Sequence, residues 1–172
     1  MNNNLIITIG REYGTGGREI GQKLALRLGV PFYDRELITR AAKKTGFDEK
    51  LFEQLDKRAT NSFLYSLTMF GSVGLNGMSL TDQLYLAQSN IIREMAEDSS
   101  CVIVGRCADH VLRDFPNKFD LFIHGSIEDR VKRVQTCGDY VIEGKTPEAA
   151  LEKMDKQRST YYNYYTGKVW GK

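Results

Sequence analysis

A glycine-rich segment near the N-terminus has the residue types needed to bind an anion. Gly10, Gly14, Gly16 and Gly17 follow the apolar run Leu5 to Ile9 and precede a helical pattern. Glycine lets the backbone approach a phosphate without a Cβ in the way. The unpaired amides at a helix start point at such an anion, and the helix dipole favours its charge. The segment therefore predicts a polyphosphate-binding turn, with a tight turn that binds no ligand as the alternative.

Two known glycine motifs fit this segment only in part. A dinucleotide fingerprint would need a third glycine where the chain has Glu19. A P-loop would need lysine in place of Gly17 and serine or threonine in place of Arg18. Arg11 and Arg18 can supply the missing positive charge, because guanidinium groups bind phosphate in a bidentate manner.

A second candidate for ligand binding is Arg106, which follows the apolar run Cys101 to Val104 and Gly105. Ligands of open α/β sheets gather at the carboxyl ends of the strands. We therefore expect Arg106 to face a ligand.

The elements that position these residues alternate between strands and helices. Short apolar runs predict strands at 5–9, 30–33, 101–104 and 119–123. Helical spacing and capping residues predict helices at about 20–28, 35–45, 48–55, 79–97, 127–136 and 146–166. This order predicts an α/β fold with a parallel sheet flanked by helices on both faces.

Residues 57–78 form the least regular segment of the sequence. Two interpretations stay open, a surface connection and a mobile segment over a substrate cleft, since long irregular loops in compact domains are often functional.

Bulk composition excludes several classes of protein. The chain has 172 residues, which predicts one domain. Its net charge of +2, from 24 basic and 22 acidic side chains, gives no support for a nucleic-acid or membrane partner. Three cysteines and two histidines, without a CxxC pair, favour reduced thiols and no metal site. Without a signal peptide or a long apolar stretch, we expect a cytoplasmic protein.

Taken together, several segments resemble the cytidylate kinase-like family, a branch of the P-loop nucleoside-monophosphate kinases. The segments that carry the resemblance are 9–20, 31–38, 102–109, 129–133 and 155–162. They span nearly the whole chain in the order typical of the family. The resemblance implies a three-layer P-loop kinase fold over residues 1–172, with 57–78 on the acceptor side and a helical lid arm at about 126–160.

The resemblance also implies roles for individual residues. ATP, with Mg²⁺ bridging its phosphates, would bind the loop; the residues implied there are Arg11, Gly14, Thr15, Gly16, Gly17, Arg18 and Glu19. Arg130 and Arg133 of the lid arm, together with Arg18, would act on the transferring phosphoryl group. A nucleoside monophosphate, CMP or dCMP first, would be held by Asp34, Arg106, Asp155 and Arg158.

The sequence also departs from the family's pattern. The P-loop lysine is absent, so Glu19 or water would have to hold the metal, and Cys107 stands where cytidylate kinases usually have aspartate. The sequence ends at Lys172, where family members typically continue with a strand and a helix, and we expect these to be missing and a sheet edge to be exposed.

Other interpretations stay open. One is a nucleotide-binding regulatory or interaction protein without turnover, and another is a kinase for a different small acceptor. Arg130 and Arg133 can equally form a solvated helix face, Asp155 and Arg158 a local ion pair, and Asp34 a helix cap. The aromatic residues of 161–170 are compatible with a homodimer.

Overall fold

The structure is a computed structural model that describes residues 3–34, 78–138, 140 and 146–172. The helices expected at 35–45 and 48–55, and the irregular segment 57–78 except for Met78, lie outside the described residues.

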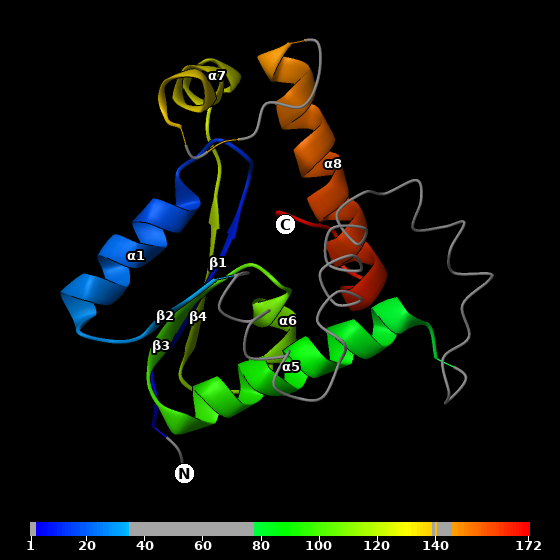
Figure 1. The fold of residues 1–172 in the computed structure, drawn as a ribbon. Coiled ribbons are helices and arrows are strands. Elements are labelled where there is room, and N and C mark those ends of the chain that lie inside the picture. Colours follow the sequence, from blue (N-terminus) through cyan, green and yellow to red (C-terminus); the bar gives the residue numbers. More distant parts are fainter. Residues whose placement is uncertain (1–2, 35–77, 139, 141–145) are drawn as a thin grey trace.

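Four parallel strands form the sheet of the described part of the chain, in the order β2-β3-β1-β4 (Figure 1). Their bounds are Ile6–Arg11 for β1, Phe32–Tyr33 for β2, Cys101–Val104 for β3 and Lys118–Ile123 for β4. In the register, Ile9 pairs with Val104 of β3 on one side and with Leu121 of β4 on the other. The predicted parallel sheet is confirmed.

Helices cover both faces of this sheet, as the alternation of elements predicts (Figure 1). Helix α1 (Gly17–Leu28) lies on one face, while α5 (Leu80–Asp98) and the short α6 (Ala108–Val111) lie on the other. Helices α7 (Ile127–Thr136) and α8 (Pro147–Thr166) pack against each other beyond the carboxyl ends of the strands. The sequence pattern did not predict α6.

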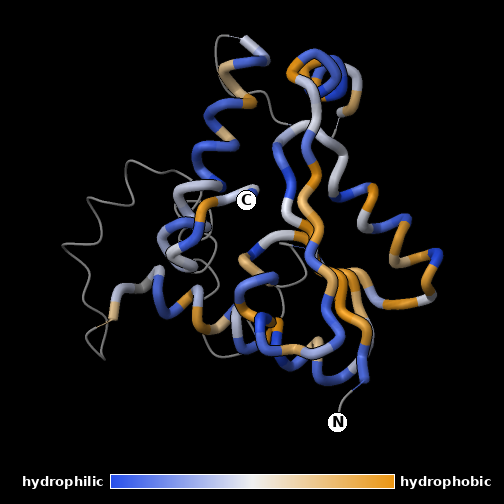
Figure 2. Tube along the Cα trace, turned by 180° about the vertical axis from the view of Figure 1, so that it is seen from behind, coloured by the Kyte–Doolittle hydropathy of each residue, from blue (hydrophilic) through white to orange (hydrophobic). Residues whose placement is uncertain are grey.

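The strands are apolar on both faces because both faces are covered. Ile7, Ile9 and Val104 pack toward Ala25 of α1. Ile6 and Ile103 point the other way, toward Ile92 of α5. Figure 2 shows hydrophobic colouring concentrated along the strands. This rigid core fixes where the strand ends lie.

The helix ends follow the expected capping chemistry. The Ser79 side chain accepts a hydrogen bond from the Asp82 amide at the start of α5. The Thr146 side chain accepts one from the Ala149 amide at the start of α8, where Pro147 is the first helical residue. Gly29 ends α1 in the left-handed conformation, with φ of 65°. Within the described residues, no helix is long and apolar enough to cross a bilayer.

Candidate functional site

The glycine loop joins β1 to α1 at the carboxyl end of the sheet (Figure 1). Gly14 and Gly16 have φ of 81° and 75°, which favours glycine at both positions. The Thr15 hydroxyl donates to the Glu12 carbonyl at 2.8 Å and tightens the turn. The N-cap residue of α1 is Gly16, which has no side chain to accept the first amides of the helix. Backbone amides at a helix start of this kind can bind an anion.

Two arginine side chains lie against this loop. A Cβ added to Gly16 would come 2.6 Å from Cζ of Arg133 in α7. A Cβ added to Gly17 would come 2.7 Å from Cβ of Arg11 at the end of β1. The two glycines therefore leave the space that these cationic side chains occupy, and the donor set suits a polyphosphate.

Glu19 is held by cations from two elements. Lys23 lies 2.6 Å away one turn along α1, and Arg133 forms a second ion pair with the same carboxylate. The hydrogen bond from Lys23, with the charges of Lys23 and Arg133, lowers the pKa of Glu19. The structure thus brings Arg133 to the loop and pairs Glu19 with basic side chains.

Arg130 and Asp155 meet at the backbone of Tyr13, just ahead of the glycines. Arg130 Nε donates to the Tyr13 carbonyl at 2.7 Å, and the Tyr13 amide donates to Asp155 Oδ1 at 2.7 Å. The two side chains also form an ion pair with each other. Burial raises the pKa of Asp155, while the Tyr13 amide and Arg130 oppose that change. In this structure both residues hold the loop in place.

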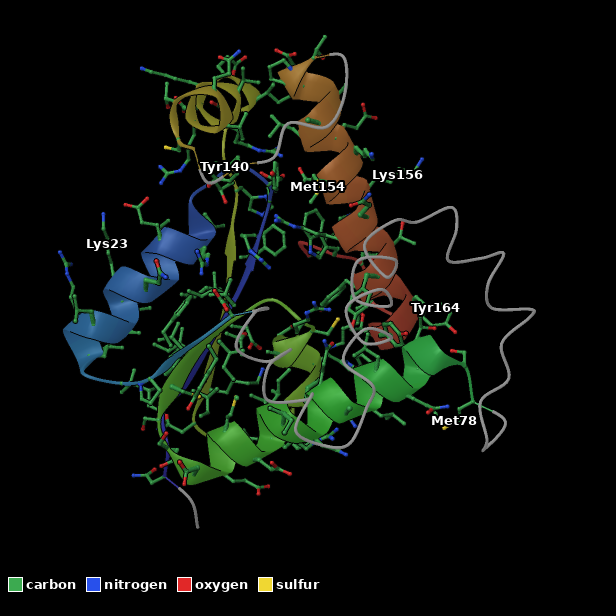
Figure 3. All side chains as sticks on the ribbon, in the orientation of Figure 1. Lys23, Met78, Tyr140, Met154, Lys156 and Tyr164 are labelled. Carbon is green, nitrogen blue, oxygen red and sulfur yellow. The ribbon has the colours of Figure 1, made fainter. Side chains whose placement is uncertain are left out.

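Glu12 extends this network toward β4, and its role was not predicted. Its carboxylate lies 3.4 Å from Arg130 Nη1 and accepts the Gly125 amide at 3.0 Å. The ring of Tyr140, labelled in Figure 3, lies edge-on to Tyr13 with centroids 5.3 Å apart. The loop is therefore tied to both ends of α7. No local spacing signals these contacts, since the partners are far apart in the sequence.

Arg18 and Asp34 form an ion pair between α1 and the end of β2. Arg18 Nε lies 2.7 Å from Asp34 Oδ2, and the Asp34 side chain is buried whereas Arg18 is half-exposed. The structure thus joins a predicted catalytic residue to a predicted acceptor residue. The helix that Asp34 could cap lies outside the described residues.

A cavity of about 330 Å³ opens at the carboxyl ends of β1, β3 and β4. Arg11, Arg106 and Arg158 line it together with Tyr161 and Tyr162. Met154 of α8 also faces it, whereas Lys156 points away from the sheet (Figure 3). The sequence prediction that Arg106 and Arg158 share a site fits this placement, and the lining residues do not include Asp155.

Arg106 is held in an uncommon conformation. Its φ is 57° and that of Cys107 is 54°, values rare outside glycine. Its Nη1 donates to Gln88 Oε1 at 3.3 Å, and its guanidinium lies 6.0 Å from the Tyr161 ring centroid. Gln88 of α5 is only 1% exposed and was missed from the sequence. The one sequence signal for Gln88 is that a polar residue interrupts the apolar face of the helix between Leu84 and Ile92.

Arg158 joins the cavity to the loop. Its Nη1 donates to the Arg11 carbonyl at 3.0 Å, and its guanidinium lies 5.1 Å from the Tyr13 ring centroid. Burial lowers the pKa of Arg158, while Asp155 opposes the change. Two strand ends and helix α8 therefore bring three arginines, Arg11, Arg106 and Arg158, to one cavity.

A second hollow, of about 350 Å³, lies between the loop and α7. Gly14 and Thr15 line it, facing Lys132 and Arg133 of α7 and the turn at Gly125. Among the described residues, no group of three or more His, Cys, Asp or Glu side chains could hold a metal ion. Mg²⁺ often binds through substrate phosphates and water with few protein ligands.

Comparisons with known proteins bear on the family and the fold of this chain. The profile of the cytidylate kinase-like family matches residues 6–172. No curated protein matches the chain. The solved structure of an uncharacterized protein from Eubacterium ventriosum is similar, with 32% identity and a TM-score of 0.71, over 98% of this chain and 82% of that one.

Two kinases share the fold at lower identity. A gluconokinase from Sinorhizobium meliloti has a TM-score of 0.53 at 15% identity, over 91% of this chain and 76% of its own. A shikimate kinase from Bacteroides thetaiotaomicron has a TM-score of 0.50 at 17% identity, over 92% of this chain and 82% of its own. These likenesses establish a P-loop kinase fold.

Proposed function

Because this chain belongs to the cytidylate kinase-like family, we propose that it is a phosphotransferase that moves the γ-phosphoryl group of ATP to a small acceptor. A nucleoside monophosphate is the proposed acceptor class, with CMP and dCMP favoured by the family. The observation that carries the proposal is the convergence of Arg11, Arg106 and Arg158 on one cavity beside an anion-binding helix start.

The loop supports binding of the donor. The helix start and the Arg133 guanidinium against Gly16 supply amides and positive charge for the phosphates. The hollow between Thr15 and α7 is large enough to take part of a nucleotide. Mg²⁺, bound through the phosphates, would neutralise the part of the phosphate charge that the protein's own cations leave.

The cavity at the strand ends supports binding of the acceptor. Arg106 follows β3 and faces the cavity, where it can bind the acceptor's phosphate. Asp34, paired with Arg18, lies on the β2 side of the loop. Phosphoryl transfer requires mainly positioning and neutralisation of oxygen charge, and rigidly held guanidinium groups provide both. We further propose that α7 and α8 form a lid arm that excludes water.

The direct test is incubation of the protein with ATP, Mg²⁺ and each of CMP, dCMP, UMP and AMP, with ADP formation as the readout. The panel includes gluconate and shikimate, because the kinases named for these acceptors share the fold. Transfer to a nucleoside monophosphate would support the proposal. A folded protein that transfers to no acceptor would contradict it.

The role of Arg106 has its own test. Losing a charged hydrogen bond costs about 1.5–3 kcal/mol, so Arg106→Ala should raise the acceptor KM roughly 10-fold to 150-fold and leave the ATP KM almost unchanged. The control is Arg113→Ala, since Arg113 is about half-exposed and does not line the cavity. Equal losses for both substrates would contradict the assignment.

A second candidate function rests on Gly17, which occupies the P-loop lysine position. A protein that binds nucleotide without turnover would then serve as a regulatory or interaction module. Calorimetry that shows tight ATP binding without transfer to any acceptor in the panel would favour this candidate.

A further inference from the structure

The side chain of Arg11 follows an unusual path from the end of β1. It crosses over Gly17, where an added Cβ would lie 2.7 Å from Arg11 Cβ and 2.8 Å from its Cγ. Its guanidinium then reaches Gly105 at the end of β3, where an added Cβ would lie 3.3 Å from Arg11 Cζ. Two glycines far apart in the sequence thus border one arginine side chain.

The backbone does not explain the glycine at position 17. Gly105 has φ of 82°, which by itself favours glycine. Gly17 is the first residue of α1 and is absent from the residues with positive φ. A helical backbone conformation does not by itself require glycine. The structural reason for glycine there is the Arg11 side chain, which fills the space a Cβ would need.

We propose that Arg11 supplies, from the end of β1, the cation that a P-loop lysine supplies from the start of the helix. In this arrangement Gly17, at the lysine position, leaves the space that the Arg11 side chain needs. The inference rests on the proposed function of the site. Arg11 lines the cavity with Arg106 and Arg158, and its side chain passes the start of α1 at Gly17. A guanidinium there can bind two phosphate oxygens at once, whereas lysine acts as a point charge.

The other arginines near the loop are directed elsewhere. Arg18 extends to Asp34 on the β2 side, and its side chain is 53% exposed. Arg133 lies over Gly16 and pairs with Glu19. Arg158 donates to the Arg11 carbonyl at 3.0 Å, which fixes the strand end from which the Arg11 side chain starts. Arg11 is therefore the cation that passes over position 17 itself.

The test is an exchange of the cation between the two positions. Five proteins are compared: wild type, Arg11→Met, Gly17→Lys, the double variant R11G/G17K, and the control Arg27→Ala, which changes an exposed residue of α1. Calorimetry measures binding of Mg·ATP and of inorganic tripolyphosphate, and circular dichroism confirms folding. Arg11→Met keeps an aliphatic stem against Gly17, so its effect reports the lost charge.

Arg11→Met should weaken binding of both ligands roughly 10-fold or more, as for the loss of a charged hydrogen bond. Gly17→Lys should also weaken binding, because the new side chain meets Arg11. The double variant should bind more tightly than either single variant, since removal of Arg11 makes room for the lysine. Wild-type affinity in Arg11→Met, or a double variant that binds more weakly than both single variants, would overturn the inference.

The outcomes also separate this inference from the proposed function. If wild type transfers phosphate and Arg11→Met behaves identically, the inference fails and the function stands. If tripolyphosphate binding depends on Arg11 but no acceptor is phosphorylated, the inference stands and the function fails. A wild-type protein that binds neither ligand overturns both.

Discussion

Replacing Asp155 by alanine should show how the glycine loop is held. The change removes the acceptor of the Tyr13 amide, at 2.7 Å, and the ion-pair partner of Arg130. The Arg130 side chain is 8% exposed and that of Asp155 is 18% exposed, so both are largely buried. The residues that remain, Tyr13 and Glu12, would have to compensate the Arg130 charge alone.

The expected cost can be worked out from these contacts. Breaking a buried ion pair by removing one partner costs about 3–5 kcal/mol. Arg130 keeps the Tyr13 carbonyl at 2.7 Å and Glu12 at 3.4 Å, which lowers that cost. The wild-type protein also bears the cost of burying the Asp155 carboxylate, which raises its pKa. Removing that carboxylate removes this cost and so lowers the expected loss of stability further. We therefore expect a loss of about 3 kcal/mol, which for 172 residues corresponds to a fall in Tm of about 8 °C.

Urea and thermal unfolding of wild type and Asp155→Ala measure this loss. The matched control is Glu152→Gln, an exposed carboxylate on the same helix. Arg130→Ala and the double variant complete a cycle, and the two losses should be strongly non-additive because the residues share one network. A loss in Asp155→Ala no larger than in the control would refute the reasoning.

Three further predictions concern other contacts of the site. Tyr162→Phe removes the hydrogen bond to Asp109 at 2.6 Å and should lower the free energy of unfolding by about 1.5–3 kcal/mol, measured in urea. Burial raises the pKa of Cys107 from 9.0 to about 12, so the folded state keeps a proton that the unfolded chain loses above pH 9. Stability should thus fall by about 1 kcal/mol between pH 9 and 10 on this account, and Cys107→Ala should lack that part of the slope. Glu19→Gln weakens the ion pair with Arg133 and should tighten ATP binding severalfold in calorimetry; unchanged or weaker binding would count against a competition between carboxylate and phosphate.

Much of the fold follows from local patterns in the sequence. The apolar run 101–104 is buried on both faces in β3, and the loop with Gly14 and Gly16 lies between β1 and α1 as predicted. Ser79 and Thr146 cap the starts of α5 and α8 through side-chain hydrogen bonds, near the predicted helix starts. These features depend on neighbouring residues, so spacing alone can predict them.

The roles of the charged residues were less predictable. From spacing, Asp155 and Arg158 share one helix face and can form a local pair, and Arg130 can be a solvated residue. In the structure Arg130 and Asp155, from different helices, meet at the Tyr13 backbone, while Arg158 reaches the Arg11 carbonyl. Periodicity gives the face of a helix but not which distant backbone that face meets.

By itself, the sequence predicted the four strands, helices α1, α5, α7 and α8, and the position of the glycine loop. Only the tertiary structure decided that Gly17 makes room for Arg11 and that Gln88 holds Arg106. The physical reason is that strand order and helix packing bring together residues separated by many positions in the chain. Those distant neighbours set the space beside a glycine, so local sequence preferences cannot predict it.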